Sequence, residues 1–283
     1  MQRGRGLTPS HVHWPSVFIA LYALIACRPP PVDTDSGDAE AGDTGTGCPA
    51  EHPFPGSIDA EGPDGPASVA TLLDRFDGIA GSIFLFEWPA EDLSAFSGIR
   101  CIEGRLDVHD SDALQSLHGL DDLVQATTIQ LSNLPELTTL EGLGSLEAVE
   151  ALLIYDYRGR SGLTSLEGLD RLRAAPYLSV SGPRALTHVD AFEHITQVTN
   201  LSLFDLPGLT NLSGLGGLTA VVNNLTIARN DSLQDLTGFD SLQWVGGDVW
   251  IWENPLLPQA EAEAWAADIA EVGGEVRVER NGP

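Results

Sequence analysis

The run Leu233–Val245, which reads LQDLTGFDSLQWV, places a large apolar residue at every third position. These positions are Leu233, Leu236, Phe239, Leu242 and Val245. A period of three is neither the 3.6 of an α-helix nor the 2 of a β-strand. The same run occurs upstream at Leu209, Leu212, Leu215, Leu218 and Val221, and at Leu137, Leu140, Leu143, Leu146 and Val149. The sequence therefore predicts a repeat protein.

A short apolar–x–apolar triplet opens each repeat and is typical of a β-strand. The triplets are Ile83/Leu85, Leu106/Val108, Ile129/Leu131, Leu152/Ile154, Leu178/Val180, Leu201/Leu203, Leu225/Ile227, Val249/Ile251 and Val276/Val278. Successive triplets begin 23 to 27 residues apart. A unit of this length cannot bury its apolar face alone, so the units must stack. Equivalent strands run in the same direction, and we expect them to pair in parallel.

Two segments depart from the repeat and are expected to cover the ends of the stack, on either side of a solenoid over residues 79–255. Residues 48–78 are largely irregular, with a short helix predicted over Ser68–Phe76, and form the N-terminal cap. Residues 256–283 form the C-terminal cap, which consists of a helix and the last strand. The helix is predicted over Pro258–Glu271, where alanine and glutamate replace the three-spaced run.

Small residues recur just before the middle apolar position of the run. They are Gly98, Gly119, Gly142, Gly168, Gly214 and Gly238, with Ala191 as the exception. A glycine repeated at one place predicts a tight corner, where a Cβ would clash or φ is positive.

The full unit, Leu-x-Ile-x-x-Asn-x-x-Leu-x-x-Leu-x-Gly-[Leu/Phe]-x-x-Leu-x-x-Val, resembles the leucine-rich-repeat-like coil of receptor L domains over about residues 79 to 283. The resemblance implies a β-solenoid of stacked 23–24-residue coils, each with one short parallel strand. Receptor L domains bind protein ligands, and similar units occur in fungal wall proteins and bacterial surface lipoproteins. The asparagine of the unit is present at Asn230, Asn254 and Asn281 and absent elsewhere.

The first 26 residues are typical of an export signal. Arg3 and Arg5 precede an apolar core over Val17–Ala26, which is too short to span a bilayer. The following Leu24-Ile25-Ala26-Cys27 resembles the lipobox of bacterial lipoproteins, which implies cleavage before Cys27 and acylation of that cysteine. Acyl chains anchor a protein to a membrane. The alternative is an ordinary secretory signal in which Cys27 is incidental.

The segment after the signal, residues 27–47, is acidic and rich in Pro and Gly, and we interpret it as a flexible tether. If Cys27 carries lipid, Cys48 and Cys101 are the remaining cysteines. In an oxidising compartment this pair is predicted to form a disulfide. Without lipidation, one thiol would be left over.

The charge and the motif content exclude several classes of function. The chain has no lysine, and its 14 arginines against 41 acids give a net charge of −27. Loss of the signal leaves 12 arginines against 41 acids, a net charge of −29. Such a surface repels nucleic acid phosphates. No HExxH, Walker, GxSxG or CxxC motif is present, so we predict no catalytic residue, no cofactor and no metal site.

The two residues that follow each triplet combine an aromatic side chain with an acid in several units, and the first of the two is expected to face solvent. Together with nearby Trp250, these positions give the predicted ligand-binding residues: Phe86, Glu87, Tyr155, Asp156, Phe204, Asp205, Trp250, Trp252 and Glu253. Aromatic faces beside carboxylates receive sugars or cationic peptide side chains. Alternatively, aromatic residues on neighbouring strands pack together and stiffen the sheet.

We therefore expect a non-catalytic lipoprotein of the bacterial cell envelope, anchored to the outer membrane or cell surface, whose solenoid binds a protein or polysaccharide ligand. Two alternatives remain. One is a carbohydrate-active β-helix enzyme that uses stacked carboxylates such as Asp110, Asp156 and Asp205. The other is a purely structural envelope protein.

Overall fold

The computed structural model describes residues 49–61 and 65–283 of the chain. The predicted signal peptide (1–26), the lipidated Cys27, the tether (27–47) and Cys48 lie outside these residues. Cys101 is buried, and its disulfide with Cys48 stays a prediction. None of the described helices is long and apolar enough to cross a membrane.

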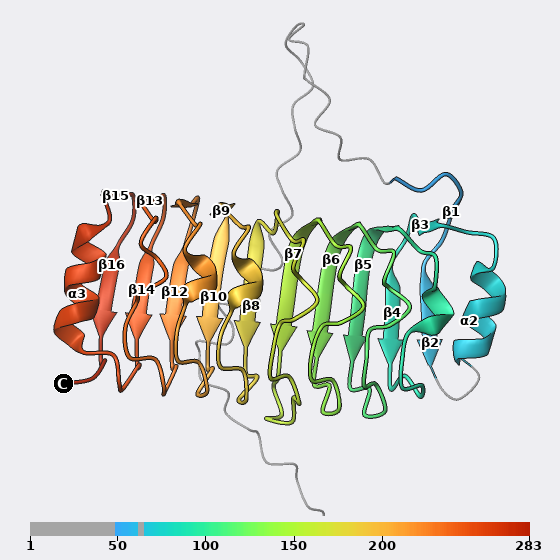
Figure 1. Ribbon diagram of the computed structural model, residues 1–283, viewed down its shortest axis with the longest axis horizontal. Coiled ribbons are helices and arrows are strands. Elements are labelled where there is room, and N and C mark those ends of the chain that lie inside the picture. Colours follow the sequence, from blue (N-terminus) through green and yellow to red (C-terminus); the bar gives the residue numbers. More distant parts are fainter. Residues whose placement is uncertain (1–48, 62–64) are drawn as a thin grey trace, which may run out of the picture. The chain divides into compact units, whose positions relative to one another are not determined.

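Parallel strands dominate the described part of the chain and form a 12-stranded sheet (Figure 1). Its longer strands are β2 (Ile58–Glu61), β4 (Ile83–Phe86), β5 (Cys101–His109), β6 (Gln125–Ser132), β7 (Ala148–Tyr155), β8 (Tyr177–Ser181), β10 (Asn200–Phe204), β12 (Leu225–Ala228), β14 (Val249–Trp252) and β16 (Val276–Glu279). Two further strands, β1 (Pro53–Phe54) and β3 (Gly78–Ile79), have two residues each. All nine predicted triplets lie in strands, and the predicted parallel pairing is confirmed.

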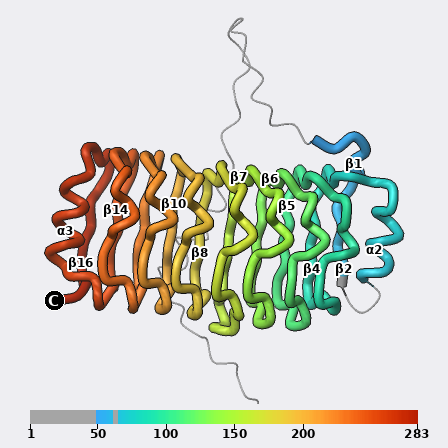
Figure 2. The backbone as a smooth tube through the Cα atoms, in the orientation of Figure 1, coloured from blue at the N-terminus to red at the C-terminus, as the bar shows by residue number. Residues whose placement is uncertain are grey.

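The register places equivalent triplet positions side by side. Leu201 of β10, for example, pairs with Leu178 of β8 and with Leu225 of β12. After each strand the backbone therefore returns to begin the next parallel strand beside it, in a solenoid-like arrangement. Figure 2 shows these turns lying in a row.

A second, smaller parallel sheet forms where the three-spaced runs end. It contains β9 (Gln197–Val198), β11 (Ala220–Val221), β13 (Trp244–Val245) and β15 (Glu271–Val272). Short 3₁₀ helices lie within three of the runs: η1 (Ser94–Phe96), η2 (Asp190–Phe192) and η3 (Ser213–Leu215). The sequence did not predict these elements, because a period of three does not distinguish a short strand from a 3₁₀ turn.

The core lies between the main sheet and the three-spaced runs. All five apolar residues of the run Leu233–Val245 are buried there. Full burial of a side chain of this size contributes about 1.5–3 kcal/mol. The run therefore faces the interior and is part of the architecture of the stack.

Helices α2 (Gly65–Leu73) and α3 (Gln259–Asp268) lie at the two ends of the row of strands (Figure 1). Both were predicted, although α2 begins three residues before the expected start. Trp265 of α3 packs against Phe239, with ring centroids 5.5 Å apart. The capping helix thus contacts an apolar position of the preceding run.

The segment 48–78 is more regular than expected, because β1 and β2 join the main sheet. β2 pairs in parallel with β4, and Ile58 and Ala60 are buried. These two residues form a further apolar–x–apolar triplet. The sequence did not reveal it because Ala60 is small and the surrounding stretch is rich in Pro and Gly, which are depleted in strands.

The predicted glycine corner is present in most units. Gly119, Gly142, Gly168 and Gly238 have φ between +106° and +110°. A Cβ on Gly142 would lie 2.3 Å from the backbone of Leu117. Gly214 lacks a positive φ, but its Cβ would lie 2.0 Å from the carbonyl oxygen of Val189.

Gly98 does not belong to this crowded column. Its φ is +86°, but a Cβ there would meet no atom within 4 Å. Its placement before the middle apolar position was wrong, because Gly98 precedes Ile99, whereas Ala95 precedes the middle position, Phe96.

Candidate ligand-binding rim

Most main strands end at a sharp corner that holds a residue in a left-handed conformation. Seven non-glycine residues have φ between 51° and 59°, and each directly follows a strand: Glu87, Asp110, Asn133, Asp205, Arg229, Glu253 and Arg280. We call them the corner column, and we call the strand-end edge that carries them the rim. Such a φ is uncommon outside glycine and costs about 1–2 kcal/mol. Since neighbouring strands are about 4.8 Å apart, the corner side chains form a closely spaced, mostly charged row.

Asparagines directly after the corner, of which Asn230 and Asn254 are fully buried, hold this geometry in the C-terminal half of the rim. Asn254 Nδ2 donates to the carbonyl oxygen of Ile227 (3.1 Å), and Asn254 Oδ1 accepts the N–H of Asn230 (3.0 Å). Asn230 and Asn281 make the same carbonyl contact with Leu203 and Ile251. These are the three asparagines of the predicted unit, and they link each corner to its neighbour.

A cleft of about 480 Å³ lies at the C-terminal half of the rim, and we call it the C-terminal rim cleft. Its charged lining residues are Arg184, Asp205, Arg229, Asp231, Glu253 and Arg280. The sign of charge alternates along the corner column from Asp205 to Arg280. Arg280 Nη1 lies 2.7 Å from Glu253 Oε1. The cleft thus offers both cationic donors and anionic acceptors.

Two aromatic residues, Phe204 and Trp252, directly precede corner residues that line this cleft, although neither ring is itself part of the lining. Phe204 and Trp252 both occupy positions in register with Ala228, on either side of it. Their ring centroids are only 5.9 Å apart, less than two strand spacings of about 9.6 Å. The rings therefore lean together and cover Ala228, which is 0% exposed. Of the predicted binding residues, Phe204 and Trp252 are thus paired with each other, and Asp205 and Glu253 line the same cleft.

The guanidinium of Arg229 is held against this aromatic pair. Its Cζ lies 5.5 Å from the centroid of the Phe204 ring, within the range of a cation–π interaction. The stacking fixes the direction in which this arginine leaves the corner.

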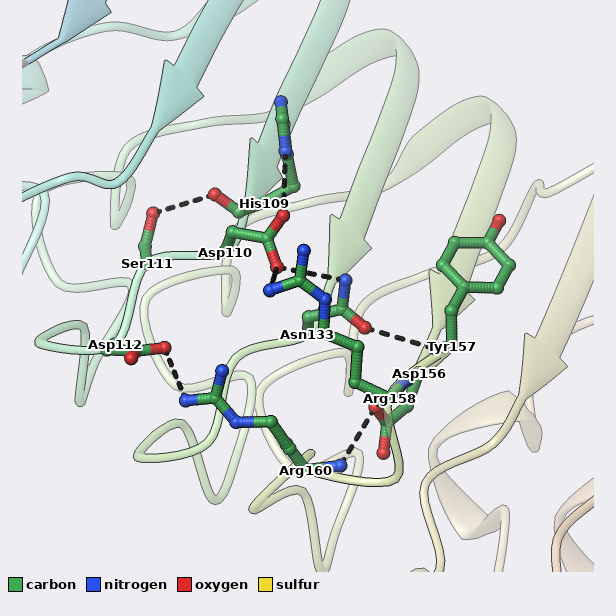
Figure 3. Close-up of polar contacts among 9 residues, drawn as sticks. All are labelled: His109, Asp110, Ser111, Asp112, Asn133, Asp156, Tyr157, Arg158 and Arg160. Atoms are coloured by element: carbon green, nitrogen blue, oxygen red, sulfur yellow. Dashed lines mark hydrogen bonds and ion pairs between the residues drawn. The ribbon is translucent and has the colours of Figure 1, made fainter. Parts of the chain in front are cut away.

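A three-residue insertion after β7 forms a loop over residues 157–161 at the N-terminal half of the rim (Figure 3). The carboxylate of Asp156 accepts the N–H groups of Arg158 (3.2 Å), Arg160 (3.0 Å) and Ser161 (2.8 Å). Both carboxylate oxygens are used, and Asp156 is buried. In this structure Asp156 shapes the loop.

The two arginines of this loop reach back to carboxylates of an earlier unit (Figure 3). Arg158 Nη1 lies 3.0 Å from Asp110 Oδ1, and Arg160 Nη2 lies 2.8 Å from Asp112 Oδ1. With Glu87 they line a second cleft, of about 330 Å³. Because its arginines are already paired with carboxylates, this cleft has less capacity for a charged ligand than the C-terminal rim cleft.

The remaining predicted binding residues do not join one site. Phe86 packs against His109, with centroids 4.9 Å apart. Tyr155 is 5% exposed and stacks on Tyr157. Trp250 is 36% exposed and lies on the outer face of the sheet, in the middle of its triplet.

The arginines of the rim were not among the predicted binding residues. Arg184 and Arg229 line the C-terminal rim cleft, and Arg158 and Arg160 line the smaller one. Arg229 and Arg280 occupy the corner position, which is acidic in Glu87, Asp110, Asp205 and Glu253. This departure from the acidic pattern was the signal available in the sequence. The insertion of two arginines after β7 was a second signal, since the other units have no counterpart.

Asp107 on β5 is an unusual acid because it is buried on the outer face of the sheet. Its Oδ1 has no hydrogen-bond partner among the described residues, and its Oδ2 lies 3.7 Å from Arg105 Nη1. Burial raises the pKa of the Asp107 carboxyl above its ordinary value, and nearby His109 and Arg105 oppose that rise only in part.

A larger recess of about 550 Å³ lies among the three-spaced runs and is lined by acids that include Asp121, Glu141, Glu167 and Asp170. Within residues 49–61 and 65–283, no group of three or more His, Cys, Asp or Glu side chains is placed to hold a metal ion. The described side chains of this recess therefore present carboxylate oxygens but no metal-binding arrangement.

Comparisons of the chain with protein-family models, curated proteins and solved structures gave no match.

Proposed function

We propose that this chain is a non-catalytic binding module of the bacterial cell envelope, with a leucine-rich-repeat-like, receptor-L-like solenoid that binds a saccharide at the C-terminal rim cleft. The proposal keeps the predicted lipoprotein signal and anchor at Cys27, so the module would be displayed on an acidic tether.

One observation carries the proposal: the C-terminal rim cleft is lined by alternating charges, and one of its lining residues, Arg229, lies over the ring of Phe204, which pairs with Trp252. Carboxylates and guanidinium groups hydrogen-bond sugar hydroxyls, and an aromatic ring contributes apolar contact with a sugar face. Corner backbone and buried asparagines fix the positions of these groups before any ligand arrives. A preorganised site loses less entropy on binding.

The enzyme alternative has weaker support at the rim. It needs two free carboxylates, but Asp156 uses both oxygens for backbone N–H groups. Asp110 is paired with Arg158 and accepts a hydrogen bond from Asn133 Nδ2 (3.1 Å). Asp205 lines the C-terminal rim cleft, whereas Asp110 lines the smaller second cleft with its carboxylate already paired.

A glycan and peptidoglycan array probed with the purified protein tests the binding function. We expect saturable saccharide binding that falls about fivefold to tenfold in Trp252→Ala, since an aromatic contact of this kind contributes about 1–1.5 kcal/mol. Tyr177→Ala is the matched control, because Tyr177 is an exposed aromatic at the start of β8, away from the rim. Release of reducing ends would favour the enzyme, and no binding to any saccharide would favour a structural protein.

The anchor is tested separately by mass spectrometry of the chain expressed in an exporting bacterium. We expect the wild type to begin at Cys27 and to carry acyl mass, and Cys27→Ala to lack it. A wild type without lipid would overturn the proposed localisation.

A further inference from the structure

We infer that the C-terminal rim cleft selects acidic saccharides of the uronic acid class, with the sugar carboxylate held by Arg184 and Arg229. The inference rests on the proposed saccharide-binding function and narrows its ligand. In this arrangement the sugar hydroxyls donate to the carboxylates of Asp205 and Asp231.

The two arginines have unused capacity for an anion. Both are exposed, and neither has a carboxylate at ion-pair distance within the described part of the chain. By contrast, Arg158, Arg160 and Arg280 are each paired with an acid. An arginine binds a carboxylate through two parallel N–H···O bonds, which are charge-assisted and directional.

The position of Arg229 in the cleft is fixed in advance. It leaves the corner with φ +59°, and its guanidinium rests on the ring of Phe204. Stacking on an aromatic face leaves the in-plane N–H groups free to donate. A ligand carboxylate would therefore meet a donor that is already oriented.

The acids of the cleft restrict the kind of anion. Asp205 and Asp231 lie in the same cleft as the two arginines, and the whole chain carries a net charge of −27. These charges repel a ligand with dense negative charge, such as a polyphosphate or a heavily sulfated glycan. A saccharide with one carboxylate among several hydroxyls satisfies both the arginines and the acids.

Isothermal titration with a panel of uronic acid oligosaccharides, each compared with its carboxyl-reduced neutral counterpart, tests the inference. We expect at least one acidic member to bind about tenfold more tightly than its neutral counterpart, corresponding to one charge-assisted contact. Arg184→Gln and Arg229→Gln should each lower the affinity for the acidic member by a larger factor than the affinity for its neutral counterpart, so that the preference falls toward equality. Arg184→Lys should retain part of it.

Arg171→Gln is the control, because Arg171 is an exposed arginine outside the cleft, and circular dichroism checks that each variant is folded. Equal affinity for acidic and neutral members, or an acidic preference that survives both Gln variants, would overturn the inference and leave saccharide binding intact. Tighter binding of inorganic polyphosphate than of any uronate would also overturn it. Absence of binding across both halves of the panel, and on the glycan array, would overturn the proposed function itself.

Discussion

Gly142 shows how a single missing side chain permits the stack. Its φ of +106° is unfavourable for other residues, and a Cβ would lie 2.3 Å from the backbone of Leu117 in the preceding unit. We expect Gly142→Ala to lower the free energy of unfolding by about 2–4 kcal/mol, from backbone strain and overpacking together. Urea unfolding measures the change.

Gly144, two residues later, is the matched control for this prediction. A Cβ there would meet no atom within 4 Å, and its φ is not positive. Gly144→Ala should be neutral or slightly stabilising, because alanine has less backbone freedom in the unfolded chain. Similar losses in both variants would show that the corner geometry is wrong.

Asp107 provides a prediction about pH. Its folded-state pKa is raised by burial, so the folded chain holds this proton at pH values where the unfolded chain has released it. The stability contributed by Asp107 therefore falls as the pH rises from the ordinary carboxyl range through the raised pKa. At about pH 7 the buried charge is a net cost, and Asp107→Asn should raise the unfolding free energy by about 1 kcal/mol.

The measurement is urea unfolding of wild type and variant over a series of pH values. The advantage of Asp107→Asn should shrink as the pH is lowered, since protonated Asp107 then carries no charge. Asp240→Asn, at an exposed acid, should show no such trend. An advantage that grows on acidification would contradict the assignment.

At the scale of the element, the inserted loop after β7 depends on one buried carboxylate. Asp156→Ala removes the acceptor for three backbone N–H groups and should loosen residues 157–161. Trypsin cleaves after arginine, so cutting after Arg158 and Arg160 reports the loosening directly. We expect those two cuts to become faster by about tenfold or more, while the cut after exposed Arg171 keeps its rate. Equal acceleration at all three would indicate global destabilisation.

The asparagine column is the second element-scale device. Asn254 is fully buried, and its side chain serves the N–H of Asn230, the carbonyl of Ile227 and the side chain of Asn281. We expect Asn254→Ala to cost about 3 kcal/mol, because it leaves buried polar groups without partners. Asn223→Ala, at an exposed asparagine, should cost less than about 0.5 kcal/mol in the same unfolding assay.

For the molecule as a whole, we expect repulsion among the acidic side chains to be the largest electrostatic contribution to the free energy of folding. Acids outnumber arginines by 41 to 14 in the full sequence, and most of the ion pairs involve exposed side chains. Exposed pairs contribute little, whereas repulsion among many like charges acts against the compact state. We expect the melting temperature to rise by a few degrees between low salt and about 0.15 M salt, where the Debye length is about 8 Å. A fall over that range would mean that attractive pairs prevail.

The parallel sheet could be predicted because two simple patterns, the triplet and the three-spaced run, each recur at fixed spacing. Val249 and Ile251 of β14 show this, since they are buried and paired at the expected register. The binding site was harder to predict. In the sequence, Phe204 and Trp252 are separate residues on different strands. Their rings come together only because both tilt toward each other over Ala228. The direction in which an aromatic ring points depends on the side chains packed around it. A comparison of equivalent positions in the sequence does not reveal that packing.

The same limit explains Tyr155 and Asp156. Their aromatic–acid pattern matches Phe204 and Asp205, but the insertion that follows supplies backbone N–H groups, and the carboxylate turns toward them. Local sequence favoured a surface role, and the nearby loop changed it. Arg184 and Arg229 are isolated basic residues 45 positions apart in an acidic sequence, and only the stacking of the strands brings them to one cleft.

The constant register of the asparagine and corner columns has a consequence for how such a chain can change in evolution. Because residues 225–248 span one whole unit, a tandem duplication of that segment would keep every buried position aligned with its neighbour. It would lengthen the rim by one strand spacing, about 4.8 Å, and add a second copy of Arg229 to the row. Gain of a complete unit thus enlarges the recognition surface while the interior repeats itself, so affinity for a long polymer can grow stepwise without a new fold.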